Sequence, residues 1–519
     1  MKKKLFLTQL LVASICLNAQ VSLVKDINPG GLSSITSSSY LKLYDEYNGK
    51  LIFTANDGSG HEAWISDGTN AGTYKIIDLN NSSFGSHPYA YVKWQGKVAF
   101  LADDNQTSSQ ELYLTDGTAL GTQNITTTST LGLGNIDAVS NQSTELLLFS
   151  TKIDLLNTNL TSITNLTNQI PNGHKIVNGF IFFQNGDGEL SISNGTPAGT
   201  IPLKDINPGN TSSSPTFPVY FNGKYYFTAN DGASGRELWV TDGTALGTQM
   251  VLDLYPGPIG SNPTELTVFN NFLIFSATHP SFGTEIFKMT TTENITNLKN
   301  INSGTGNSSP FGYTVFNNEL YFAADDGTNG IELWKSGGFP ANTIMLKDIN
   351  SSGESTPQGF TEYNNKLYFN ADDGINGREL WATDGSSSGT IMVHDIFTPG
   401  NSSSDPLNLI VVNNSLFFYA IESPLIGREL YKYDDPTLSL SDIKYENSIS
   451  LLPNPTNSSF SLNSKLNPKK ILVINAQGKT VKSFNRTSDK YYIDDLTTGI
   501  YFIKINTEKG DIVKKLIKY

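Results

Sequence analysis

Several residue types are scarce in this chain of 519 residues. Its one cysteine, Cys16, lies among the first twenty residues, so the rest of the chain offers no disulfide and no thiol chemistry. After those residues, no apolar run approaches the roughly 18 residues of a membrane-spanning helix. The formal net charge of −13 argues against nucleic acid as a partner.

Histidine is also scarce, which limits the chemistry available to the chain. The five histidines are expected to lie in different structural units, and no HExxH sequence or paired histidine spacing occurs. Metal-dependent hydrolysis therefore has no local signature. The five residues are His61, His87, His174, His279 and His394.

The first residues have the pattern of a secretory signal. Three lysines at 2–4 precede a short apolar run, and small residues lie near Ala19. We predict that residues 1–19 are a signal peptide and that the protein leaves the cytoplasm.

What the chain has in abundance is a repeat. The glutamate that opens ELWVTDGTALGTQMVLDL (237–254) returns at steps of 49, 78, 48, 48, 47, 47 and 50 residues. A period of this size indicates stacked supersecondary units. The glutamates are Glu62, Glu111, Glu189, Glu237, Glu285, Glu332, Glu379 and Glu429.

One period predicts four short antiparallel strands. Apolar runs at 217–221, 224–229, 237–242 and 248–254 alternate with Asn-Gly, Asn-Asp-Gly and Asp-Gly-Thr turns. Four-stranded modules of this length are typical of β-propeller blades. We therefore predict an all-β fold, with a large propeller over residues 20–433.

The blade count is eight or nine, with nine counted. The long step contains a degenerate unit near 145–167 that still alternates like strands. Residues 22–30 match only the last strand of a unit, and residues 409–433 match only the first three. We expect the N-terminal strand to complete the final blade and thereby close the ring.

The C-terminal part of the chain differs from the repeat. Residues 434–450 are predicted to be a linker, and residues 451–519 a small antiparallel β-sandwich. This segment resembles the type A C-terminal sorting domain of the type IX secretion system. The resemblance rests on Pro453, Asn454, Pro455, Gly478, Gly499, Lys514 and Lys515, within PNP, NAQGK, DLTTGIYFIKI and a terminal KKL.

That resemblance implies export of the protein by the type IX machinery. The protein is then expected to be secreted, or to lie on the outer-membrane surface of a Gram-negative bacterium, after passing through the periplasm. Removal of the sorting domain usually accompanies this route.

The repeat itself resembles the family named for its ELWxxDGT repeats, which implies architecture and no catalytic residues. We expect its residues to be structural: tryptophan for packing, in preference to sugar platforms; aspartate to accept N–H bonds in its own turn; and Gly243 and Gly247 to take positive φ angles. The repeat residues are Glu62, Trp64, Asp67, Glu237, Trp239, Asp242, Glu332, Trp334, Glu379, Trp381 and Asp384.

One cofactor is considered, and otherwise none is expected. The loops between second and third strands carry aspartates beside glycines, and such carboxylates could hold calcium. The alternative is that each aspartate bonds to its own backbone. The candidates are Asp57, Asp231, Asp326 and Asp373. These loops and the loops between blades are predicted to lie on one face.

The sequence favours a non-enzymatic propeller that binds or adheres to extracellular polysaccharide or a surface protein. An alternative is a secreted polysaccharide-degrading enzyme, which needs two carboxylates near the propeller centre. Self-association as a surface-layer component is a third reading. Carboxylates outside the repeat are Glu145, Asp154, Glu265 and Glu422, and solvated surface is favoured for each.

Overall fold

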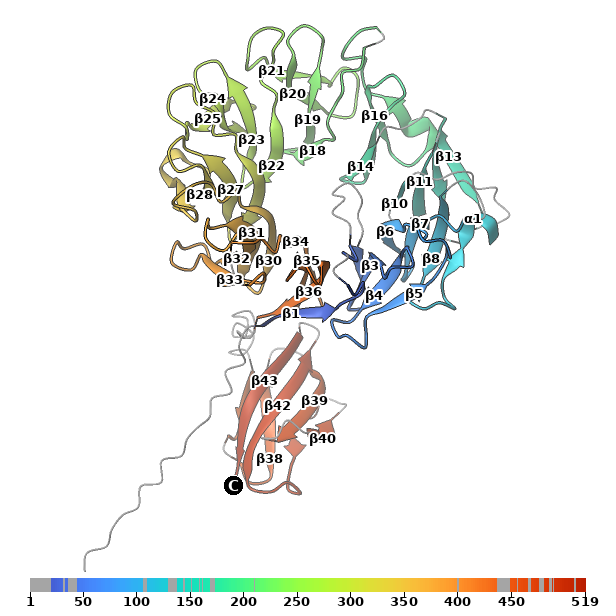
Figure 1. Ribbon diagram of the computed structural model, residues 1–519, viewed down its shortest axis with the longest axis vertical. Coiled ribbons are helices and arrows are strands. Elements are labelled where there is room, and N and C mark those ends of the chain that lie inside the picture. The colour runs from blue at the N-terminus through green and yellow to red at the C-terminus, as the bar shows by residue number, and fades with distance from the viewer. Residues whose placement is uncertain are drawn as a thin grey trace, which may run out of the picture. The chain divides into compact units, whose positions relative to one another are not determined.

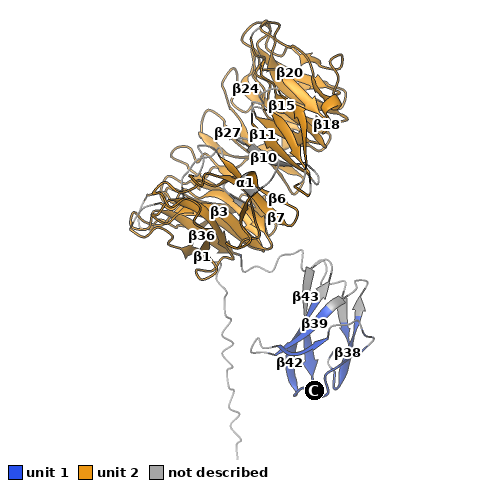
Figure 2. Cartoon of the chain, turned by 90° about the vertical axis from the view of Figure 1, so that its right-hand side faces the viewer, with its two compact units in different colours: residues 1–19, 435–519 blue, residues 20–434 orange. Residues whose placement is uncertain are grey.

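The computed structural model describes most of the chain. The described residues are 20–30, 33–35, 44–105, 110–128, 138–142, 145–150, 152–157, 159–160, 162–168, 173–209, 211–398, 401–435, 449–454, 456–464, 468–475, 480–484, 488, 490–507 and 510–519. Residues 20–434 form one compact unit, and residues 435–519 belong to another (Figure 2).

The larger unit is all-β, with nine four-stranded antiparallel sheets among its described residues (Figure 1). Its described helices are single turns at α1 (Ile125–Thr128), η1 (Pro197–Gly199) and η2 (Pro340–Asn342). No described helix is long and apolar enough to cross a membrane. The predicted all-β class and the blade-like sheets are therefore confirmed.

Eight sheets consist of strands that are consecutive in the chain. The first four contain β2 (Tyr44–Tyr47), β3 (Lys50–Asn56), β4 (His61–Ser66) and β5 (Tyr74–Ile77); β6 (Tyr89–Trp94), β7 (Lys97–Ala102), β8 (Glu111–Thr115) and β9 (Gln123–Asn124); β10 (Ala138–Gln142), β11 (Glu145–Phe149), β12 (Ile153–Leu156) and β13 (Ile163–Thr167); β14 (His174–Val177), β15 (Phe180–Gln184), β16 (Leu190–Ser193) and β17 (Thr200–Pro202). The degenerate segment near 145–167 thus supplies β11, β12 and β13, which form a four-stranded sheet with β10.

The next four contain β18 (Val219–Phe221), β19 (Lys224–Asn230), β20 (Arg236–Thr241) and β21 (Gln249–Leu252); β22 (Thr264–Phe269), β23 (Phe272–His279), β24 (Gly283–Thr290) and β25 (Ile295–Lys299); β26 (Phe311–Phe316), β27 (Glu319–Asp325), β28 (Ile331–Ser336) and β29 (Thr343–Lys347); β30 (Gln358–Tyr363), β31 (Lys366–Asp372), β32 (Arg378–Thr383) and β33 (Ile391–His394).

The ninth sheet joins the two ends of this unit. It contains β34 (Leu407–Val412), β35 (Ser415–Ile421), β36 (Arg428–Asp434) and, as its outer strand, β1 (Gln20–Lys25). β1 runs antiparallel to β36, with Val21 opposite Tyr433 and Leu23 opposite Tyr431. The N-terminal strand therefore completes the last sheet, as expected from the sequence.

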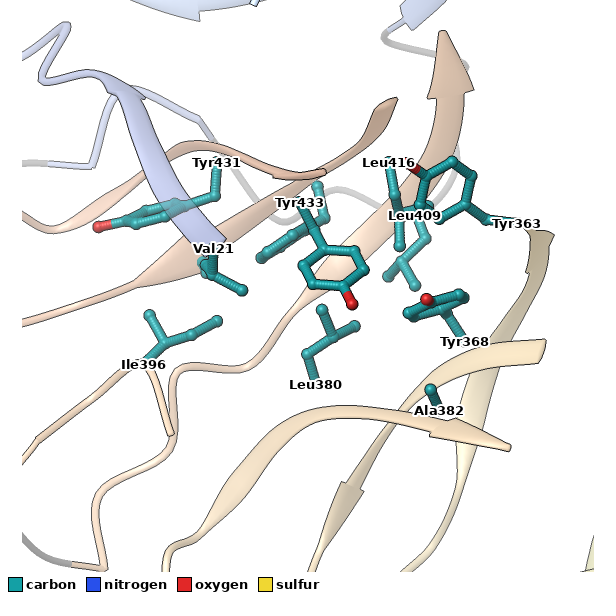
Figure 3. Packing of buried hydrophobic residues seen from close by; sticks show 12 residues of the cluster. Val21, Tyr363, Tyr368, Leu380, Ala382, Ile396, Leu409, Leu416, Tyr431 and Tyr433 are labelled. Atoms are coloured by element: carbon teal, nitrogen blue, oxygen red, sulfur yellow. The ribbon is translucent and has the colours of Figure 1, made fainter. Parts of the chain in front are cut away.

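Hydrophobic cores lie between neighbouring sheets. One cluster joins Phe227 and Trp239 of the β18–β21 sheet to Phe182 and Ile192 of the β14–β17 sheet. Similar clusters join every other consecutive pair from β2–β5 to β30–β33. Two more join the ninth sheet to the β30–β33 sheet, shown in Figure 3, and to the β2–β5 sheet. Both faces of each sheet are therefore buried, which explains apolar runs such as YYFTA in β19.

The smaller unit contains a three-stranded and a four-stranded sheet. The first consists of β37 (Ile449–Leu452), β38 (Ser459–Ser464) and β41 (Tyr491–Tyr492), and the second of β40 (Thr480–Phe484), β39 (Pro468–Asn475), β42 (Gly499–Thr507) and β43 (Gly510–Lys518). One core cluster contains Phe460 and Tyr491 from the first sheet and Val473 and Ile503 from the second.

Candidate functional site

The repeated glutamates are buried hydrogen-bond acceptors. Glu237 lies on β20, and its Oε1 accepts the N–H groups of Tyr255 (3.3 Å) and Ser261 (2.6 Å). Its Oε2 accepts the Leu254 N–H (3.3 Å) and the Ser261 hydroxyl. The carboxylate thus holds the loop that leads to the next sheet. The same serine contact joins Glu62 to Ser86, Glu189 to Ser213, Glu285 to Ser308, Glu332 to Ser355, Glu379 to Ser404 and Glu429 to Ser34.

Burial raises the pKa of six of these carboxyls, and hydrogen-bond donors only partly oppose it. The pKa of Glu379 is raised to about 6 and that of Glu429 to about 7. The other four are Glu62, Glu237, Glu285 and Glu332. Such shifts occur at catalytic sites, but here each belongs to a repeated structural position.

The free energy of unfolding is expected to fall as pH rises from 5 to 7. Because the folded pKa of Glu429 (about 7) exceeds the reference value of 4.5, its stabilising contribution is complete below pH 4.5 and lost by about pH 7. One proton corresponds to a slope of about 1.4 kcal/mol per pH unit. Urea unfolding at three pH values should show a shallower slope for Glu429→Gln.

Glu362→Gln provides the control for this measurement. It makes the same chemical change at a side chain that is exposed and therefore not part of a core. The control should keep the wild-type slope. Equal slopes in the wild type and Glu429→Gln would contradict the assignment.

The tryptophans lie in the cores between sheets. Trp64, Trp239, Trp334 and Trp381 expose only 5–6% of their surface, which is incompatible with a sugar platform. A lysine of the preceding sheet lies 5.8 Å from the ring centroid of Trp239 and of Trp381. These lysines, and two others, donate to a threonine carbonyl of the next sheet. The pairs are Lys25 with Thr73, Lys204 with Thr248, Lys299 with Thr343 and Lys347 with Thr390.

The Asp-Gly-Thr turns use their aspartates locally. Asp242 Oδ1 accepts the Thr244 N–H (2.9 Å) and hydroxyl (2.7 Å), and the Thr244 Oγ1 accepts the Gly247 N–H (3.0 Å). Asp67 and Asp384 bond to their own turns in the same way. Gly243 has a positive φ of 94°, as expected.

The prediction that Gly247 takes a positive φ angle was wrong. Gly247 does not have a positive φ, and it is required because a Cβ there would lie 2.0 Å from Asp242 Oδ1.

The four calcium candidates lie on four different sheets, each in the loop between the second and third strands. Each bonds to its own turn: Asp231 Oδ1, for example, accepts the N–H groups of Ala233 (2.9 Å) and Ser234 (2.7 Å). Burial raises the pKa of the Asp231 carboxyl, but these donors outweigh it and lower the value. Asp57, Asp326 and Asp373 make equivalent bonds. The structure does not bring the four together.

One group of acidic side chains does lie close together, and none of its members is among the four calcium candidates. Within the described residues, Asp103, Asp104 and Glu111 have carboxylate oxygens within 4.8 Å of one another. Asp104 also accepts the Tyr113 hydroxyl at 2.8 Å. Tyr113 stands where four of the eight repeats have tryptophan, and its hydroxyl donates to Asp104 in this group.

The carboxylates outside the repeat do not converge. Glu145 and Asp154 lie on the β10–β13 sheet, where Lys152 lies 2.8 Å from Asp154. Glu265 lies on β22 and accepts the Gly312 N–H at 3.0 Å. Glu422 follows β35 and accepts the Tyr431 hydroxyl at 2.8 Å. The three locations are on sheets that are not neighbours.

Two histidines from different parts of the repeat meet, which the expectation that the five lie in different units did not include. The rings of His61 and His87 stack with centroids 4.8 Å apart, because the loop before β6 runs beside the start of β4. Burial lowers the pKa of His61, and the neighbouring His87 adds to this effect.

The sequence GSSSG at 385–389 fits the GxSxG pattern of a serine-hydrolase nucleophile turn. In the structure it connects β32 to β33, whereas that turn requires a strand followed by a helix. The serine at the nucleophile position would be Ser387, and the preceding Ser386 bonds to Asp384 within the turn. We assign it no catalytic role.

Several described residues of the sorting signal lie on the last strand, β43, or bond to it. The Asn454 side chain donates to the Lys515 carbonyl (2.7 Å) and accepts the Ile517 N–H (2.9 Å). Gly499 begins β42, and Lys514 lies on β43. Pro455 and Gly478 lie outside the described residues.

Comparison with known families identifies this C-terminal unit. Residues 450–519 match the family described as "Secretion system C-terminal sorting domain". The match confirms the predicted sorting domain, and with it secretion through the type IX system to the cell surface or beyond in a Gram-negative bacterium. An interaction with the type IX machinery follows. A search of the curated proteins found no match.

Solved structures resemble the chain only distantly. The computationally designed protein Ika8 is 15% identical, with 68% of this chain and 99% of that chain covered and a TM-score of 0.39. The extracellular domain of a one-component system from B. thetaiotaomicron is 11% identical (94% and 75% covered, TM-score 0.32). PorZ, a surface component of the type IX secretion system of Porphyromonas gingivalis, is 9% identical (96% and 100% covered, TM-score 0.26).

Proposed function

We propose that residues 20–434 form a closed nine-bladed propeller of ELWxxDGT repeats that binds an extracellular polysaccharide or surface protein without catalysis. Closure is supported by the pairing of β1 with β36 and by the cores on both sides of the ninth sheet. Residues 1–19 act as the signal peptide. The linker to the sorting domain lies within the predicted range 434–450, from which Asp434 is excluded because it ends β36, and Ile449 and Ser450 because they begin β37.

The repeat residues are structural in this proposal. Their functional groups are already engaged within the fold: glutamates on loops, aspartates on their own turns, tryptophans in cores. Binding therefore falls to residues that vary between blades.

One loop face carries such residues. The loops between second and third strands contact the loops between sheets, as where the His61 N–H donates to the Phe84 carbonyl at 3.1 Å. Four large apolar side chains on these loops are mostly exposed; one such side chain alone needs no explanation, and the proposal rests on all four being on loops at the same end of their sheets. They are Phe84 (75%), Ile259 (65%), Ile375 (73%) and Leu425 (80%). We call these four side chains the loop tips, and their exposure is the observation that supports the proposal most directly.

Replacing all four loop tips with serine is expected to weaken binding at least tenfold while leaving the melting temperature unchanged, since none of them lies in a core. The control is the double variant Leu120→Ser and Leu246→Ser, whose residues are 97% and 98% exposed on Asp-Gly-Thr turns. Binding is measured on a glycan array and on isolated cell-surface protein. Equal loss in both variants, or release of reducing ends, would overturn the proposal.

A further inference from the structure

The repeat is interrupted where the ninth sheet packs against the β30–β33 sheet, and we call this contact the seam. At four other contacts between sheets, a lysine before the Asp-Ile-Asn segment or its equivalent reaches a threonine carbonyl of the next sheet, as Lys347 reaches Thr390 at 2.6 Å. At the seam the lysine position holds His394, and the tryptophan position of the next sheet holds Tyr431. The outer strand there is β1, which no Asp-Gly-Thr turn precedes.

A cavity of about 570 Å³ opens at the seam. Its apolar lining comes from β1 and from the segments 394–398 and 422–426. The ring of Tyr431 also lines it. Figure 3 shows Val21 and Ile396 beside the Tyr431 ring, whose hydroxyl points away from the core. The lining residues are Val21, Ser22, Leu23, His394, Asp395, Ile396, Thr398, Glu422, Ile426 and Tyr431.

The polar side of the cavity is acidic. Glu422 stands at the repeat position of Asp57 and Asp373, but its Oε2 accepts the Tyr431 hydroxyl at 2.8 Å instead of its own turn. Its Oε1 accepts no hydrogen bond from the described residues. Asp395 adds a second carboxylate, and the His394 side chain beside it is exposed.

We propose that the seam cavity binds a primary alkylammonium group, such as a lysine side chain or a free aliphatic amine. The aliphatic lining suits an alkyl stem, and the two carboxylates suit the ammonium group. The ligand takes the place that the repeat's own lysine occupies at four other contacts between sheets. This site does not depend on which partner the loop face binds.

The test uses isothermal titration of the purified full chain at pH 7 with n-pentylamine, and in parallel with 1-pentanol and pentanoate, which keep the stem but lack the cation. We expect saturable millimolar binding of the amine alone. Titration with a lysine-containing peptide and with its acetyl-lysine form then distinguishes a peptide side chain from a free amine. Binding of pentanol as tight as that of the amine, or no saturable binding of the amine, would refute the site.

Three variants locate the binding. Glu422→Gln should weaken it at least tenfold. His394→Lys, which places at this exposed position the lysine found at four other contacts between sheets, should abolish it by filling the cavity. Asp373→Asn removes one charge at the equivalent position of the neighbouring sheet and should change nothing. Wild-type affinity in both seam variants would overturn the proposal even if an amine binds elsewhere.

Discussion

Deletion of β1 is expected to abolish cooperative unfolding of the 20–434 unit. The deletion removes the strand pairing with β36 and the buried side chains of Val21 and Val24, which lie in the two clusters on either side of the ninth sheet. Two valines at about 1.5–3 kcal/mol each and five strand pairings at about 1 kcal/mol each sum to about 8–11 kcal/mol. That equals the whole stability of many domains.

The measurement is urea unfolding monitored by tryptophan fluorescence, together with limited proteolysis, on the chain lacking residues 20–25. β36 would become an unpaired edge, so aggregation is also expected. A synthetic peptide of residues 20–30 should restore a cooperative transition, and a scrambled peptide should not. An unchanged transition without β1 would show that the last sheet does not need its fourth strand.

Glu237→Ala is expected to lower the free energy of unfolding by about 3 kcal/mol or more. The change leaves the N–H groups of Leu254, Tyr255 and Ser261 without their acceptor. The Ser261 bond is buried and the other two are partly buried, and a buried donor without an acceptor costs about 1–3 kcal/mol. Because these donors hold the loop to the next sheet, cleavage between 254 and 261 should become faster than elsewhere. Denaturant unfolding and mapped proteolysis measure the two effects.

Glu362→Ala is the matched control, because this glutamate is exposed on β30, and it should change stability by less than about 0.5 kcal/mol. If Glu237→Ala unfolds no more easily than the control, the repeated glutamate does not hold the loop.

The role of that glutamate could have been inferred further from the sequence. A serine recurs 23 to 25 residues after most of the glutamates, and this spacing is the signal for the hydrogen bond that the structure contains. By contrast, the position of Asp57 in a glycine-rich loop does not indicate whether its carboxylate faces a ligand or its own turn. That choice depends on backbone angles that residue type alone does not determine.

The cavity at the seam could not be predicted from the sequence for a different reason. His394 and Tyr431 are ordinary departures from the repeat when considered singly, and only their packing against β1 creates the cavity. The stack of His61 on His87 is similar, because it requires two loops to run side by side.

The amino-acid sequence by itself determined the period, the strands within it, the turn chemistry and the sorting tail, since each depends on residues close together in the chain. Only the tertiary structure decided which carboxylates are buried and which residues line the cavity beside β1, whose place in the last sheet the repeat had already predicted. Those outcomes rest on contacts such as the Ile27 N–H with Glu429, 402 residues apart, whose formation depends on how all the intervening sheets pack.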